Sequence, residues 1–206
     1  MRELLILSVS ILFVFSAVGC SGPLGSNVAA SNKTVVTAGG IQVIIDEGGQ
    51  FPDLLVGKWA QGDGWELNFE PNGVLSHIRH VFGKVEMKPY YVAHIPVLGN
   101  KEALFKPGGW FVNYTPSSRL LTVKITIEDF NFPIGEDSLT GSSVDILTGP
   151  VSEDGTIWQV TWTSFPDYVG HTKELPNYKL PVLDPNGDVR EVVFEKVKEQ
   201  EPASKE

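Results

Sequence analysis

Alternation of apolar and polar residues with a period of two is the feature that most constrains how this chain folds. In residues 121–128 the apolar side chains are Leu121, Val123, Ile125 and Ile127, and polar side chains stand between them. Residues 65–69 repeat the same pattern. Successive side chains of a β-strand point to opposite faces, so the pattern predicts strands with one buried face and one polar face.

Turn signals separate these runs and predict hairpins. The Pro-Asn-Gly turn at 71–73 follows the run at 65–69, and Asn-Gly readily adopts the positive φ angles of a tight turn. Similar clusters of turn residues stand at 115–118 and 152–155, and a final pair of strands is expected between residues 183 and 194.

Helical periodicity is weak throughout, with short helical turns expected only near 51–56 and 101–105. The sequence therefore predicts an all-β fold over residues 39–198. We expect an antiparallel meander that closes into a barrel, because closure removes exposed sheet edges. A β-sandwich is the alternative.

Composition limits the classes of partner. A chain of 206 residues, 42% of them hydrophobic, is long enough for one domain with a sizeable core. The formal net charge of −9 disfavours binding to nucleic acid or to anionic lipid headgroups, because both need clustered Lys and Arg to neutralise phosphate. No nucleic-acid partner is expected.

The N-terminus carries a second strong pattern. Residues 4–18 form an uncharged apolar run, shorter than the roughly 20 residues of a membrane span but suited to the core of an export signal. The run ends in Ala17-Val18-Gly19-Cys20, where small residues precede the only cysteine of the chain. An odd cysteine in an exported protein requires an explanation.

This motif resembles the lipobox of bacterial lipoproteins, in which the cysteine thiol receives diacylglycerol and a dedicated peptidase cuts before it. The resemblance implies that residues 1–19 are a lipoprotein signal peptide and that the mature chain begins at a lipidated Cys20. The alternative is an ordinary secretory signal cut between Gly19 and Cys20. The expected location is the cell envelope, and Ser21 in place of an aspartate favours the outer membrane if the cell is Gram-negative.

Two further segments are expected to lie outside the packed domain. Residues 20–38 are rich in Gly, Ser, Ala, Asn and Thr, which predicts a lipidated, flexible tether between the membrane and the β domain. Residues 199–206 are charged and predict a polar tail.

The start of the β domain carries a Gly-x-Trp motif at Gly57 and Trp59. With residues 65–69 and the turn that follows, it resembles the opening of bacterial lipocalin-like domains. The resemblance implies a lipocalin-like barrel in which the Trp59 indole lies across the base under an arginine from the last strand, for which Arg190 is the counterpart. The alternative is a buried tryptophan after a flexible glycine at the start of any β domain.

The sequence does not place metal-binding residues at the spacings that a metal site requires. The histidines are His77, His80, His94 and His171. The first two are three residues apart, which places them on opposite faces of a regular strand, so no metal site is expected. Residues 184–188 begin like a calcium loop, but Gly187 stands in the fourth place, where an EF-hand needs glycine in the sixth. A β-turn is expected there instead.

No catalytic residue and no cofactor are expected. The chain has no Gly-x-Ser-x-Gly elbow, and its cysteine is assigned to the anchor. The acidic pairs at 128–129 and 136–137 fall in expected loops. Gly108 and Gly109 lead into a strand and not into a helix that could cradle phosphate.

Aromatic residues are numerous, and most of them are expected in the core, but their functional interpretation is the mouth of a barrel that binds an apolar ligand. Those expected to line an apolar pocket or its lid are Tyr90, Tyr91, Trp110, Trp158 and Trp162, and the segment 85–107 is the expected lid or partner-facing loop. The leading hypothesis is a non-enzymatic envelope lipoprotein that binds a small apolar ligand or a protein partner. The alternatives are a structural or interaction module of the envelope and an envelope hydrolase.

Overall fold

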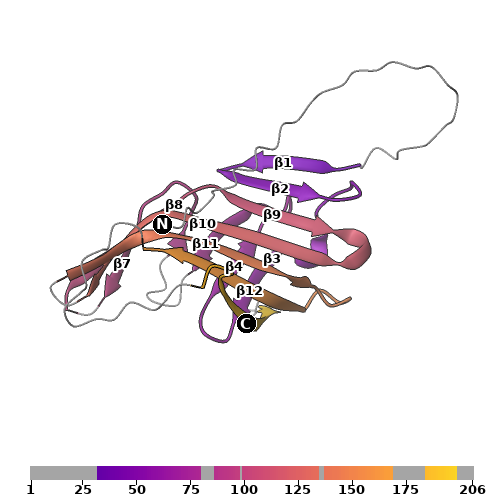
Figure 1. Cartoon of the computed structure of the whole chain (residues 1–206). Coiled ribbons are helices and arrows are strands. Elements are labelled where there is room, and N and C mark those ends of the chain that lie inside the picture. Colours follow the sequence, from indigo (N-terminus) through magenta and orange to yellow (C-terminus); the bar gives the residue numbers. More distant parts are fainter. Residues whose placement is uncertain (1–31, 80–85, 98, 135–136, 169–183, 199–206) are drawn as a thin grey trace, which may run out of the picture. The chain divides into compact units, whose positions relative to one another are not determined.

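The computed structural model describes residues 32–79, 86–97, 99–134, 137–168 and 184–198 (Figure 1). The expected signal peptide, Cys20 and residues 20–31 of the expected tether lie outside these ranges, as do His80, His171 and the expected tail. Within the described ranges, no helix combines the length and apolarity that a membrane span requires.

The described residues form one sheet of 13 strands. In chain order the strands are β1 (Thr34–Ala38), β2 (Ile41–Ile45), β3 (Gly57–Gln61), β4 (Glu66–Phe69), β5 (Leu75–Arg79), β6 (Glu86–Met87), β7 (Ala93–Val97), β8 (Lys101–Pro107), β9 (Trp110–Thr115), β10 (Leu120–Ile134), β11 (Asp137–Pro150), β12 (Ile157–Asp167) and β13 (Asp188–Lys196). The helical segments in this part of the chain are two short 3-10 helices, η1 (Asp53–Leu55) and η2 (Pro116–Ser118). The all-β class and the short turn expected near 51–56 are confirmed.

Eleven of the strands follow one path of paired neighbours, β1-β2-β9-β10-β11-β12-β13-β3-β4-β5-β6, and the β7–β8 hairpin joins it through β10 (Figure 1). The sheet is mostly antiparallel and curls into a half-barrel, with β13 paired to β3 and β2 parallel to β9. The expectation of one continuous meander is therefore wrong in strand order. Alternation reports which face of a strand is buried, but not which strand lies beside it.

The turn at Asn72-Gly73 joins β4 to β5 as expected. Gly73 has a φ of 80°, and its N–H donates to the Glu70 carbonyl at 2.8 Å. The Asn72 side chain accepts a hydrogen bond from the Val74 N–H at 3.0 Å. The hairpins expected around 115–118 and 152–155 are also confirmed, because β9 pairs with β10 and β11 pairs with β12. Where a final pair of strands was expected between residues 183 and 194, the described residues contain one strand, β13.

Three segments expected to lack regular structure are strands. β1 covers Thr34–Ala38, which the composition assigned to the tether, and all five of its residues pair with β2. β8 replaces the turn expected at 101–105, and β6, β7 and β8 occupy most of the loop expected at 85–107. Pro96 is tolerated because β7 is an edge strand that pairs with β8 alone among the described strands. In β1 the β-branched residues Thr34, Val35, Val36 and Thr37 themselves favour a strand, and in all three segments pairing with a neighbouring strand fixes the extended backbone.

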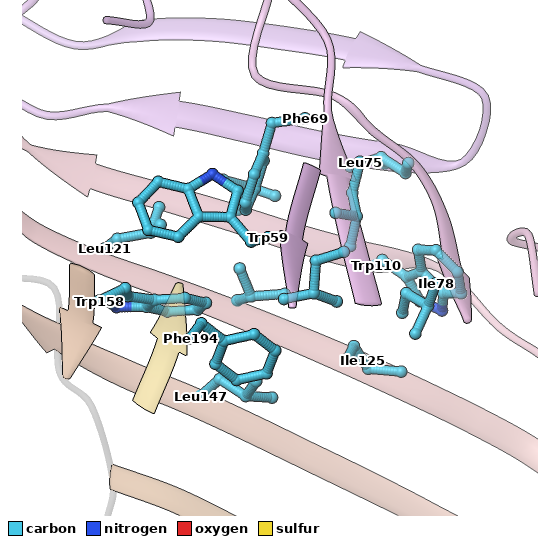
Figure 2. Close-up of a cluster of buried hydrophobic side chains, with 14 of the residues drawn as sticks. Trp59, Phe69, Leu75, Ile78, Trp110, Leu121, Ile125, Leu147, Trp158 and Phe194 are labelled. Carbon is cyan, nitrogen blue, oxygen red and sulfur yellow. The ribbon is translucent and has the colours of Figure 1, made fainter. Parts of the chain in front are cut away.

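Large aromatic side chains make part of the half-barrel solid (Figure 2). Trp59, Trp158 and Phe194 are fully buried, and the rings of Trp158 and Phe194 lie 5.4 Å apart between centroids. The Trp158 indole N–H donates to the Gly149 carbonyl at 3.0 Å, and the Trp59 indole N–H donates to the Leu55 carbonyl at 2.9 Å. Both buried donors are therefore satisfied, which holds each ring in one orientation.

Candidate functional site: a pocket on the inward face of the sheet

A pocket of about 580 Å³ lies on the same face of the sheet as this core. Its lining residues are Asp63, Trp65, Met87, Phe105, Ile125, Ile127, Phe130, Phe132, Leu139, Ser143, Asp145, Trp162, Ser164, Pro166, Tyr168 and Arg190. Most of them belong to β8, β10, β11, β12 and β13. Small-molecule sites usually measure about 300–1,000 Å³, so the pocket has the size of a ligand site.

Phe130 contacts two other aromatic rings of the pocket lining. Its ring stacks on Phe105 with the centroids 5.9 Å apart, and it meets the Tyr168 ring edge-on at 6.3 Å. Ile127 and Phe130 both line the pocket, although a spacing of three sends side chains to opposite faces of a regular strand. A β-bulge between these two residues shifts the register of β10 against β11 and turns Phe130 inward.

Two neighbouring residues in the sequence indicate this bulge. Glu128 and Asp129 are both exposed and stand side by side within β10, where strict alternation would bury one of them. Two consecutive polar residues inside a strand pattern are the signal of an extra residue. Because this pair was expected to lie in a loop, Phe130 was not among the expected pocket residues.

The inward face changes from apolar to polar along β11, β12 and β13. Leu147 and Phe194 are buried in the solid core, whereas Asp145, Ser164 and Arg190 line the pocket. Asp145 pairs with Ser164 in the register of β11 and β12. Arg190 is exposed, and Asp145 and Ser164 are half-buried, so a ligand in the pocket can reach all three groups. A few polar groups in an otherwise apolar pocket can fix the orientation of a bound ligand.

Trp162 contacts both charged side chains of the pocket that lie on β11 and β13. Its indole N–H donates to a carboxylate oxygen of Asp145 at 2.9 Å. The Arg190 guanidinium carbon lies 4.0 Å from the centroid of the Trp162 ring, a cation–π contact. Trp65 meets Trp162 edge to face, with the centroids 4.8 Å apart. One indole therefore holds a positive group over its face and a negative group at its nitrogen.

The structure separates the five aromatic residues that were expected to share a pocket. Trp162 lines the pocket, but Trp110 and Trp158 are 2% and 0% exposed and belong to the core. Tyr90 and Tyr91 are 62% and 72% exposed, lie between β6 and β7, and are not part of this lining. Aromatic side chains that point inward are packed against neighbouring strands, except where the sheet leaves a hollow.

Gly57 and Trp59 occupy the start of β3, where Gly57 has a φ of 108° that other residues rarely adopt. Arg190 does not cover Trp59, which corrects the expectation from the resemblance. The β13 partner of Trp59 is Lys196, and six residues of strand, about 20 Å, separate Lys196 from Arg190. Arg190 is instead the cross-strand partner of Trp162.

The described histidines lie in separate places. The His77 ring on β5 lies 3.2 Å from the Ser76 hydroxyl oxygen and 3.9 Å from a Glu86 carboxylate oxygen, and burial lowers the pKa of His77. The exposed His94 ring on β7 lies 3.1 Å from a Glu102 carboxylate oxygen. Within the ranges described above, no group of three His, Cys, Asp or Glu residues converges as metal ligands would.

Residues 184–187 form the expected turn. The Gly187 N–H donates to the Asp184 carbonyl at 2.9 Å, and the Asp184 carboxylate accepts from the Asn186 N–H at 2.8 Å. Gly187 has a φ of 83°, which explains why glycine stands in the fourth place. These bonds support the turn interpretation of the motif over a calcium loop.

A second, larger hollow of about 830 Å³ lies near the ends of β3 and β13. It is lined by charged residues such as Lys58 and Lys196. Lys58 forms an ion pair with Glu66 at 3.2 Å, and the Lys196 ammonium donates to the Leu54 carbonyl at 2.7 Å. These cations therefore already have partners within the chain, and the smaller aromatic pocket is the better candidate for a site.

Comparison with models of protein families, with curated proteins and with solved structures found no match for the chain. The fold and the pocket define an all-β half-barrel with a concave site whose lining includes six aromatic side chains. Function is therefore argued from the side chains of that site and from the sequence motifs.

Proposed function

We propose that the half-barrel binds a small apolar ligand and that the protein is a non-enzymatic lipoprotein held in the cell envelope by an acylated Cys20. The observation that carries the binding function is the pocket around Phe130, because large aromatic side chains line a hollow of about 580 Å³ and do not close it. Apolar pockets with a few convergent polar groups are typical of ligand sites.

The packing of the half-barrel interior favours the pocket around Phe130 as the binding place. Around Trp158 and Phe194 the interior is close-packed, so a ligand would have to displace core side chains there. Around Phe130 the bulge in β10 opens the inward face. A lipocalin-like kinship is part of the proposal, supported by the positive φ of Gly57 and the complete burial of Trp59.

An interaction module is the second candidate. Tyr90, Tyr91 and Val92 are consecutive and more than half exposed, with exposures of 62%, 72% and 54%. Consecutive exposed apolar residues are characteristic of contact surfaces. This candidate gains weight if the pocket proves unable to bind an apolar probe.

Blocking the pocket is expected to weaken ligand binding. Ser143 lines the pocket on β11, so Ser143→Phe should fill part of the space and lower the affinity for N-phenyl-1-naphthylamine by about tenfold or more. The measurement is the rise in probe fluorescence on titration of the full chain carrying Cys20→Ser, which needs no detergent. Ser142→Phe is the matched control, since the next residue of a strand faces the other way. Equal affinity in the two variants, or no saturable binding by the unsubstituted pocket, would contradict the binding function.

Replacing Cys20 is expected to release the protein from the membrane. Cys20→Ser removes the thiol that accepts diacylglycerol, and two or three acyl chains account for firm anchoring, whereas a single chain gives only marginal binding. We expect the native protein in the membrane fraction with an intact mass that includes the acyl chains, and the variant in the soluble fraction. A native mass that corresponds to a free thiol, or to a retained initiator methionine, would overturn the anchor.

A further inference from the structure

We propose that the pocket selects a zwitterionic amphiphile, whose anionic group binds the Arg190 guanidinium and whose ammonium group binds the Asp145 carboxylate. The inference rests on the proposed function, namely that this pocket binds a ligand. It adds the chemical class of that ligand. The tail of the amphiphile would lie against Phe130 and Phe105, and its head would lie beside Trp162.

The positions of the two charges carry the argument. Arg190 lies over the face of Trp162 at 4.0 Å, and Asp145 accepts the indole N–H of the same residue at 2.9 Å. Both charged groups are therefore held by one rigid ring, which limits the side-chain entropy lost on binding. They line the pocket, so a ligand can reach both of them.

Neither Arg190 nor Asp145 forms an ion pair within the part of the chain that the structure describes. No carboxylate oxygen among those residues lies within 4.0 Å of the Arg190 guanidinium, although Asp145 contacts the same indole. The stacked guanidinium keeps its in-plane N–H groups available for an anion, since stacking uses only its flat face. Asp145 accepts a hydrogen bond from Trp162 and keeps further acceptor capacity for a cation.

A head group with one sign of charge fits less well. Asp63 and Asp145 both line the pocket with Arg190, so a purely anionic head group enters a site that also holds two carboxylates. A cation that approaches Asp145 meets the guanidinium on the same indole. A head that carries both charges satisfies Arg190 and Asp145 together. The aromatic ring of Trp65, edge-on to Trp162 at 4.8 Å, adds a surface that favours an ammonium group.

The test compares octyl compounds that share one tail and differ in head group. Octylphosphocholine, octyl sulfate, octyltrimethylammonium and octanol each compete with N-phenyl-1-naphthylamine for the full chain carrying Cys20→Ser, below their micellar concentrations. We expect octylphosphocholine to bind about tenfold more tightly than octanol, because its phosphate accepts hydrogen bonds from the Arg190 guanidinium and its trimethylammonium group, which has no N–H, is attracted electrostatically by the Asp145 carboxylate. The two singly charged compounds should fall between them.

Two substitutions separate the charges. Arg190→Gln should weaken octylphosphocholine and octyl sulfate by about five- to tenfold without weakening octyltrimethylammonium. Asp145→Asn keeps an oxygen for the Trp162 N–H and should weaken octylphosphocholine and octyltrimethylammonium instead. Glu191→Gln, on the exposed neighbour of Arg190 on β13, removes a carboxylate that accepts from the Thr161 hydroxyl and should change none of the affinities.

The outcomes distinguish this inference from the proposed function. If octanol displaces the probe as well as octylphosphocholine does, the pocket binds apolar ligands but the head-group selection is wrong. If octyl sulfate or octyltrimethylammonium binds most tightly, the zwitterion is likewise wrong. If neither the probe nor any octyl compound binds, the proposed function itself fails. The comparison of head groups needs no pocket variant, so it decides the matter even if a substitution impairs folding.

Discussion

Trp158→Ala is expected to lower the free energy of unfolding by about 3–5 kcal/mol, the usual cost of removing a large aromatic side chain from a core. Trp158 is fully buried, and its ring lies 5.4 Å from that of Phe194 between centroids. The substitution also removes the indole N–H that donates to the Gly149 carbonyl at 3.0 Å, leaving a buried acceptor without that partner. The midpoint of urea unfolding, followed by circular dichroism, measures the loss.

Tyr91→Ala is the matched control for this substitution. Tyr91 is 72% exposed, so its truncation should change the free energy of unfolding by no more than about 0.5 kcal/mol. If Trp158→Ala and Tyr91→Ala shift the urea midpoint by similar amounts, then the interior around Trp158 is not the solid core of this half-barrel. Binding of an apolar probe by the folded fraction should survive in both variants, because neither residue lines the pocket.

Gly149→Ala is expected to cost about 2–3 kcal/mol of unfolding free energy, within the range measured for overpacked interiors. A Cβ at residue 149 would overlap the carbonyl oxygen of Gln159 on the adjacent strand β12. Because a backbone atom cannot rotate away as a side chain can, β11 and β12 would have to separate locally. The same movement would disturb the hydrogen bond from Trp158 to the Gly149 carbonyl.

Gly62→Ala provides the control for Gly149→Ala. A Cβ at residue 62 has no neighbour within 4 Å, and its φ lies outside the range that favours glycine. The added methyl group should therefore be neutral, or stabilise by about 0.4–1 kcal/mol through the reduced entropy of the unfolded chain. Thermal unfolding of the two variants measures the difference. A Gly149→Ala protein as stable as Gly62→Ala would show that β11 and β12 do not approach as closely as described.

Much of the fold could be predicted because it depends on local alternation and turn chemistry. The strand around Leu121 to Ile127 and the turn at Asn72-Gly73 are readable from a few neighbouring residues. Strand order was not readable, since the pairing of β13 with β3 joins residues more than 130 positions apart in the chain. β1 was missed for a different reason, because Thr34–Ala38 was grouped with the Gly-, Ser- and Asn-rich residues before it, although it pairs with the neighbouring strand β2 in a local hairpin.

The candidate site was predicted only in part. Trp162 was expected from its aromatic character, but Phe130 depends on a bulge that displaces it by one position along β10. Arg190 was assigned to the wrong tryptophan because a resemblance gives an approximate strand position without the register. Cross-strand pairing places it beside Trp162. A shift of one residue in the strand register moves every side chain of that strand to the other face of the sheet. A small error in the register predicted from the sequence therefore places several residues outside the site.

By itself the sequence determined the all-β class and the positions of the main turns, because each of these depends on short-range patterns, and the proposed anchor at Cys20 rests on the resemblance of residues 17–20 to a lipobox. Only the tertiary structure decided which part of the inward face is filled and which part is hollow. It brought Asp145 from β11 and Arg190 from β13 to the same indole, Trp162. Such convergence depends on strand order, register and a bulge, all of which are set by pairing between distant segments of the chain.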